Sequence, residues 1–109
     1  MDTVTALSGS GPAYFFLVIE ALEQAAVKHG LPPESAHLLT LQTAYGAAKM
    51  ALESTEELGE LRQRVTSPGG TTEQAINTLQ DGNVKELFER ALAAAEQRSK
   101  ELATLFGED

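Results

Sequence analysis

Three observations predict an all-α fold for this chain: a core poor in aromatic residues, recurring helix start and stop signals, and a helical stripe near the C-terminus. Apolar residues make up 42% of the 109 residues but aromatic residues only 6%, and tryptophan is absent. The core must therefore consist mostly of Leu, Ala and Val side chains, which suit closely packed helices better than a β-sandwich. We expect one domain, residues 1–109, with about five helices.

The first predicted helix begins at Gly11 and Pro12 and runs to about His29. Proline is favoured in the first turn because the N–H that it lacks would have no partner there. Gly30 can adopt the left-handed conformation that ends helices. The segment 13–19, with sequence AYFFLVI, is apolar on every side, which a small monomer can hardly bury, so we expect it to face a partner.

Four further helices follow from local signals. The second spans about 33–53, and Ser54 with Glu57 predicts a capping box that opens a short third helix to about Val65. A fourth begins near Thr71 and stops at the turn signal of residues 81–83. The last has an apolar stripe at i, i+3, i+4 and i+7. Its members are Val84, Leu87, Phe88, Ala91, Leu92, Ala95, Leu102, Leu105 and Phe106.

Composition argues against several classes of partner. The formal net charge of −8 would repel nucleic acid and anionic membrane surfaces on average. The chain has no cysteine, so it has neither disulfides nor a thiolate nucleophile. The charge-free run from Thr3 to Ile19 is interrupted by glycines, serines and a proline and has no basic segment before it, so we expect neither a membrane span nor a secretion signal.

The segment SPGGTT, residues 67–72, is typical of an anion-binding corner. Consecutive glycines can turn their N–H groups toward one point, and the helix N-terminus adds donors with about half a positive charge. A carboxylate or phosphate would fit there. The alternative is a purely structural turn in which Gly69 and Gly70 reverse the chain, Thr71 caps the helix and Gln74 completes a capping box. The two interpretations are compatible, with the Thr72 hydroxyl left for a ligand.

Other candidate motifs are weaker. No lysine follows Gly70, so a nucleotide-type phosphate loop is absent, and SGSGPAY at residues 8–14 has Tyr14 where a dinucleotide fingerprint needs glycine. His29 and His37 are eight residues apart, and no nearby carboxylate lies at ligand spacing on the same face, so we predict no metal site. Lys49 has the residue type of a general acid, although a solvated lysine is the commoner case.

Three segments together resemble pyrroline-5-carboxylate reductases, in their C-terminal half. They are ALSGSGPAYF before and within the first helix, HGLPPESA between the first two helices, and VTSPGGTTEQAI before the fourth. Each is weak alone, but their order and separations are specific, and the resemblance covers essentially the whole chain. The resemblance implies a helical domain whose long helices interleave with a second subunit, in a homodimer or a larger assembly of dimers.

The resemblance also implies a reaction, the reduction of 1-pyrroline-5-carboxylate to L-proline with NADPH or NADH in the cytoplasm. Carried over by position, Thr72 would be the catalytic residue, hydrogen-bonded to the ring nitrogen. Ser10, Gly11 and Pro12 would lie beside the nicotinamide. The substrate carboxylate would be bound by the segment that contains Ser67, Gly69, Gly70, Thr71 and Thr72.

The family's N-terminal Rossmann domain has no counterpart in this sequence, because Met1 and Asp2 stand directly before the helical motif. We therefore expect residues 1–109 to be the C-terminal dimerisation and substrate domain, inactive without a cofactor-binding domain. Two alternatives remain open: a helical dimerisation module with no catalytic role, and a different imine or hydroxy-acid reductase that shares this domain.

Overall fold

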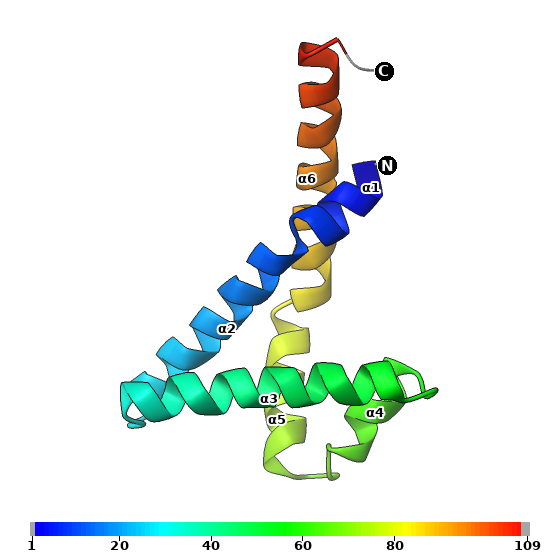
Figure 1. The fold of residues 1–109 in the computed structure, drawn as a ribbon. Helices are drawn as coiled ribbons and strands as arrows, with labels where there is room; N and C mark the ends of the chain where they lie inside the picture. Colours follow the sequence, from blue (N-terminus) through cyan, green and yellow to red (C-terminus); the bar gives the residue numbers. More distant parts are fainter. Residues whose placement is uncertain (1, 108–109) are drawn as a thin grey trace. The chain divides into compact units, whose positions relative to one another are not determined.

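The computed structural model describes residues 2–107, which fold into helices and connecting turns with no strand among them (Figure 1). The elements are α1 (Asp2–Val4), a π-helical turn η1 (Thr5–Gly9), α2 (Gly11–Lys28), α3 (Pro33–Glu53), α4 (Leu58–Arg64), α5 (Thr71–Asp81) and α6 (Val84–Leu105). The predicted all-α fold is confirmed, and α2 to α6 correspond to the five expected helices.

Two of the predicted turns use the residues that their geometry requires. Gly30 has φ of +107°, and the N–H of Leu31 bonds the carbonyl of Ala26 while that of Gly30 bonds Val27. This pattern is a Schellman motif, which explains why α2 ends at a glycine. At the second turn the left-handed residue is Asn83, with φ of +61°, and not the glycine before it.

Three predicted helix starts need correction. Gly11 and Pro12 do not begin a new helix from a loop, because α1 and η1 already run helically into Ser10. The expected capping box at Ser54 is wrong: α4 begins only at Leu58, and the Ser54 hydroxyl instead accepts a hydrogen bond from the Glu56 N–H over 3.0 Å. Finally, α5 includes Thr71, so that residue is the first of the helix and not its cap.

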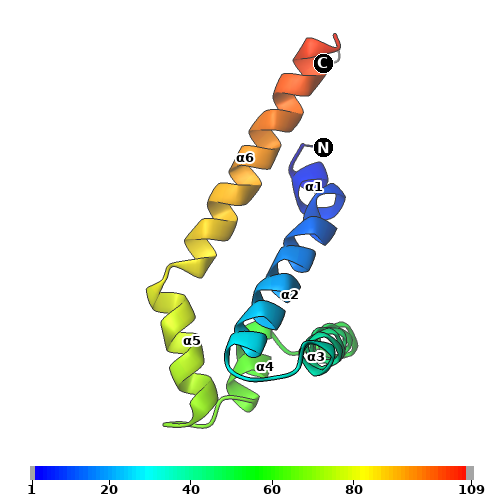
Figure 2. The ribbon, with the colours of Figure 1, turned by 90° about the vertical axis from the view of Figure 1, so that its left-hand side faces the viewer.

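The chain divides into two compact units, which are described separately. The first contains the chain up to Tyr14 and the chain from Glu73 onward. In it α1 and η1 pack against the C-terminal half of α6, as Figure 2 shows. Ala6 of η1 is only 1% exposed, and the Ser99 hydroxyl donates to Asp2 Oδ1 over 2.8 Å.

The second unit, Phe15–Thr72, holds most of α2, together with α3, α4 and the SPGGTT loop. Its helical hairpin places Glu23 of α2 against His37 of α3, with Oε1 and Nδ1 2.6 Å apart. Sequence reasoning missed this contact, because the two residues meet only once the Gly30 turn folds the hairpin. Ala36, at the start of α3, is 1% exposed.

Much apolar surface is left uncovered in the described residues. Phe15, Phe16 and Leu17 are 65–69% exposed, and Leu52 is 87% exposed. Isolated exposed apolar residues are ordinary, but three bulky ones in succession on α2 are not. The helical stretch Asp2–Lys28 contains an 18-residue window of mean hydropathy 1.2, so by length and composition it could cross a membrane, and the expectation of no membrane span stays a prediction.

Candidate functional site

The SPGGTT loop connects α4 to α5 through a closed turn. The N–H of Gly70 donates to the carbonyl oxygen of Ser67 over 2.9 Å, with Pro68 second and Gly69 third in the turn. Gly69 has φ of +73°. These features define a type II turn, which favours proline at the second position and requires a positive φ at the third. Gly69 is therefore a glycine for conformational reasons.

Gly70 is a glycine because the turn is tight. A Cβ on Gly70 would lie 3.1 Å from the Ser67 carbonyl oxygen, closer than ordinary van der Waals contact, and 3.4 Å from the Ser67 Cβ. The two glycines are thus explained within the loop itself, as the structural interpretation expects. The same turn directs the chain into the N-terminus of α5, so the anion-binding interpretation is compatible with it.

The end of α4 fixes the other side of the loop. The Thr66 hydroxyl donates to the Arg62 carbonyl over 2.6 Å, and the Thr66 N–H bonds the Gln63 carbonyl over 3.1 Å. Carbonyls in the last turn of a helix have no partner within the helix, and these bonds satisfy two of them. The loop is therefore anchored at Thr66 before the turn and at α5 after it.

The predicted substrate-binding residues differ in exposure. Ser67, Gly69 and Thr71 are exposed, whereas Gly70 and Thr72 are half-buried. Since α5 begins at Thr71, the N–H groups of Thr71 and Thr72 lie in the first turn of the helix. N–H groups in a first helical turn have no acceptor within their own helix. Glu73 in the same turn is negative, so a carboxylate bound there would depend on directed N–H donors and not on net charge.

The predicted cofactor-facing residues lie in the first unit, at the junction of η1 and α2. The N–H of Ser10 bonds the Thr5 carbonyl over 3.1 Å, and the Ser10 carbonyl accepts from Ala13 over 3.0 Å. Gly11 is buried, yet a Cβ on it would meet nothing within 4 Å. Gly11 is therefore not required by contacts within the described chain, unlike Gly70. Pro12 is exposed.

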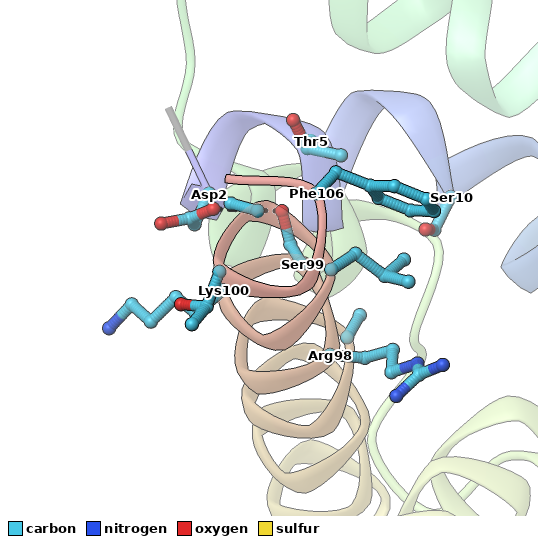
Figure 3. Close-up of a pocket in the computed structure, with 11 residues that line it drawn as sticks. Asp2, Thr5, Ser10, Arg98, Ser99, Lys100 and Phe106 are labelled. Atoms are coloured by element: carbon cyan, nitrogen blue, oxygen red, sulfur yellow. Dashed lines mark hydrogen bonds between the residues drawn. The ribbon is translucent and has the colours of Figure 1, made fainter. Parts of the chain in front are cut away.

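Ser10 also lines an open groove of about 950 Å³ between the N-terminal turns and the end of α6 (Figure 3). In Figure 3 the Phe106 ring lies between Thr5 and Ser10. At the other end of the groove Ser99 is hydrogen-bonded to Asp2. Arg98 and Lys100 point to opposite sides of α6 and do not converge on one point. The groove thus combines an apolar ring with hydroxyl groups.

The remaining candidates have ordinary surroundings. Lys49 is paired with Glu53 at 2.8 Å, one turn further along α3, and is 53% exposed, so it is the solvated lysine and not a buried general acid. Among residues 2–107 no three His, Asp or Glu side chains form a group able to hold a metal ion. His29 is exposed at the end of α2.

Comparison with known proteins gives one consistent answer. Residues 1–102 match the family model for pyrroline-5-carboxylate reductase dimerisation. Over 108 residues the chain is 58% identical to the pyrroline-5-carboxylate reductase of Pseudomonas aeruginosa, covering 99% of this chain and 40% of that protein. The corresponding enzyme of Methanosarcina acetivorans is 52% identical over 102 residues, 94% of this chain and 38% of the relative.

Solved structures agree with the sequence relatives. A pyrroline-5-carboxylate reductase from Coxiella burnetii matches with a TM-score of 0.91 and 60% identity over 93% of this chain and 37% of its own. A Plasmodium falciparum pyrroline carboxylate reductase with NADP bound gives a TM-score of 0.90 at 40% identity, over 93% of this chain and 38% of its own. The chain spans about two-fifths of the length of these relatives, and it belongs to the pyrroline-5-carboxylate reductase dimerisation family.

Proposed function

We propose that this chain is the substrate-binding and dimerisation half of an enzyme that reduces 1-pyrroline-5-carboxylate to L-proline with NADPH or NADH. The observation that carries the proposal is the type II turn at Ser67–Gly70, which delivers Thr71 and Thr72 to the N-terminus of α5 in a chain of this family. A Rossmann domain preceding residue 1 would complete the enzyme, and without it the chain should bind but not catalyse.

In the proposed site the loop binds the substrate carboxylate. The N–H groups of Gly70, Thr71 and Thr72 and the Ser67 hydroxyl are donors within one short stretch of chain, and charge-assisted hydrogen bonds of this kind are about twice as strong as neutral ones. Because the Gly70 N–H already bonds the Ser67 carbonyl, it would contribute through a shared bond or as part of the turn. Thr71 and Thr72 are therefore the principal backbone donors.

Thr72 would orient the imine. Its hydroxyl can donate to the ring nitrogen, which fixes the imine carbon for attack and helps the nitrogen accept a proton as the C=N bond becomes a C–N single bond. The half-buried position of Thr72 favours this role over that of the exposed Thr71. A pre-positioned hydroxyl loses less entropy on forming the bond than a freely rotating surface group.

Ser10, Gly11 and Pro12 would lie against the nicotinamide, which supplies the hydride when the cofactor is bound. A buried Gly11 with open space at its Cβ position fits a planar ring that approaches the backbone closely. The NADP bound in the Plasmodium falciparum relative supports a nicotinamide cofactor. We propose either NADPH or NADH as the cofactor, since the residues that would determine the preference lie in the cofactor-binding domain.

We also propose that a second copy of this chain covers the exposed apolar side chains. Phe15, Phe16 and Leu17 follow one another along α2, so no rotation of that helix within one chain buries all three. A second protein subunit fits better than lipid, because Glu20 and Glu23 lie on the same helix as these three apolar residues. A homodimer, alone or assembled further, in the cytoplasm is the state that we expect.

Activity of the two-domain protein tests the proposal. This chain, preceded by its cofactor-binding domain, should oxidise NADPH or NADH in the presence of pyrroline-5-carboxylate and form proline. If the complete protein leaves pyrroline-5-carboxylate unreduced, the assignment fails. Reduction of another cyclic imine or of a 2-oxo acid in its place would identify a different reductase that shares this domain.

A non-catalytic dimerisation module is the second candidate, favoured by the fact that the turn itself explains Gly69 and Gly70. Proline and a carboxylate analogue soaked into crystals of the two-domain protein separate the candidates. A carboxylate bound at Thr71 and Thr72 supports the reductase. An empty loop at saturating ligand supports the module.

A further inference from the structure

Ser10, Gly11 and Pro12, called the corner in this subsection, follow a segment of unusual backbone geometry. Residues Thr5–Gly9 form a π-helical turn, closed by the bond from the Ser10 N–H to the Thr5 carbonyl, five residues back. Such turns insert one extra residue into an otherwise α-helical stretch, and they occur preferentially at functional sites. The extra residue rotates everything that follows by about 100° relative to a regular helix of 3.6 residues per turn. The direction in which the corner faces therefore depends on this turn.

Tyr14 holds the turn from the far side of the corner. Its hydroxyl donates to the carbonyl oxygen of Ala6 over 2.6 Å, across eight residues of chain. The donor is in the first turn of α2 and the acceptor is inside the π turn, so this one bond spans Ser10, Gly11 and Pro12. Tyr14 is half-buried and Ala6 is 1% exposed, so water competes poorly for the bond.

Helix α6 fixes the other side of the same segment. Besides the Asp2–Ser99 bond, the Thr3 hydroxyl donates to Glu96 Oε2 over 2.6 Å. Both contacts lie before the π turn. These two contacts hold the chain before the π turn against α6, whereas the Tyr14 bond holds the chain after the π turn against the turn itself. Tyr14 is thus the side chain that ties the corner to a fixed part of the first unit.

We propose that Tyr14 is a positioning residue for the nicotinamide: it fixes the π turn so that Ser10 and Gly11 face the ring of the cofactor. The inference rests on the proposed function of the chain. Tyr14 itself does not take part in the reaction, because its hydroxyl is committed to the Ala6 carbonyl. Its contribution is to limit the orientations of the corner before the cofactor arrives, which lowers the entropic cost of binding.

Tyr14→Phe in the two-domain protein tests the inference, since it removes one oxygen and retains the ring. The expected result is a loss of about three- to tenfold in NAD(P)H affinity, the range for one part-buried hydrogen bond. Affinity is measured by cofactor fluorescence without substrate. The KM for pyrroline-5-carboxylate at saturating cofactor should change less than twofold. Tyr45→Phe is the matched control, because Tyr45 is a tyrosine of α3 that is 69% exposed, and it should leave both constants unchanged.

The outcomes separate the two hypotheses. If the unsubstituted protein binds NAD(P)H but does not reduce pyrroline-5-carboxylate, the proposed function fails, whereas the affinity comparison still tests Tyr14. If Tyr14→Phe lowers only the thermal midpoint and leaves cofactor affinity as it was, Tyr14 is merely structural and the inference is overturned. Equal losses in cofactor affinity and in the substrate KM would overturn it as well, since a general loss of structure would produce them.

Discussion

The N–H of Gly70 bonds the carbonyl of Ser67 over 2.9 Å, and this single bond closes the turn that leads the chain into α5. In this type II turn Gly69, which lies between them, has φ of +73°. Every property proposed for the loop depends on that conformation, because it determines where the first N–H groups of α5 point. The turn is therefore the feature to perturb first.

Replacing Gly69 with alanine should destabilise the protein by about 1–2 kcal/mol, the cost of a left-handed conformation for a residue with a Cβ. The same substitution should weaken binding of proline or a carboxylate analogue, because the turn relaxes to avoid the strain. Thermal unfolding and calorimetric titration measure the two effects.

Gly59→Ala is the matched control. Gly59 lies within α4 without a positive φ, and a Cβ there would meet nothing within 4 Å. Alanine is favoured over glycine in a helix by up to about 1 kcal/mol, so this variant should be as stable as the unsubstituted protein or more so. A Gly69→Ala protein with unchanged stability would show that the turn is not under conformational constraint.

Replacing Thr72 with alanine should lower kcat on the order of 100- to 1000-fold, as expected for loss of one donor to a reacting group. The dimer and the affinity for NAD(P)H should be unchanged, and Thr72→Ser should restore most of the activity because it returns the hydroxyl. Steady-state kinetics with sedimentation of the same samples measure these quantities. Loss of folding in Thr72→Ala would instead assign Thr72 a purely structural role at the start of α5.

The sequence predicted the helices well because their signals are local. Gly30 before two prolines and the Gly82–Asn83 pair mark helix ends whatever the rest of the fold does, and both helix ends are present. The start of α4 was mispredicted at Ser54 for a physical reason. A serine followed by Glu57 can cap a helix, but its hydroxyl bonds Glu56 two residues on, and the helix starts later.

The candidate site was predictable in part. The pattern Pro68-Gly69-Gly70 indicates a turn by itself, whereas the role of Thr72 came only from family resemblance. The π turn at Thr5–Gly9 was not predictable, because this segment packs on α6 from the other end of the chain. The Tyr14 bond was not predictable either, because its acceptor, the Ala6 carbonyl, lies inside that turn. The sequence feature that could have drawn attention to Tyr14 is its place in the segment SGSGPAY, where a dinucleotide fingerprint would have a glycine.

Breaking the pair between Glu23 and His37 should have only a small effect on stability. The His37 side chain is 63% exposed and that of Glu23 24% exposed, and pairs of this kind contribute about 0.2–1 kcal/mol. A double-mutant cycle with Glu23→Gln and His37→Ala, measured by denaturant unfolding, should give a coupling in that range. A coupling of several kcal/mol would mean that a partner subunit buries the pair.

Replacing Phe16 with aspartate should convert the proposed dimer to monomers. Phe16 is 69% exposed within one chain, so a charge there costs little in an isolated subunit but must be desolvated if a second copy covers it. Sedimentation equilibrium should report a dimer for the unsubstituted protein and a monomer for Phe16→Asp. The thermal midpoint of the unsubstituted protein should also rise with concentration, since association stabilises only the folded form.

Gln24→Asp introduces the same charge at an exposed polar position of α2 and should remain dimeric. Dissociation of both variants would point to repulsion from added charge, and a Phe16→Asp protein that stays dimeric would exclude this face of α2 from the interface.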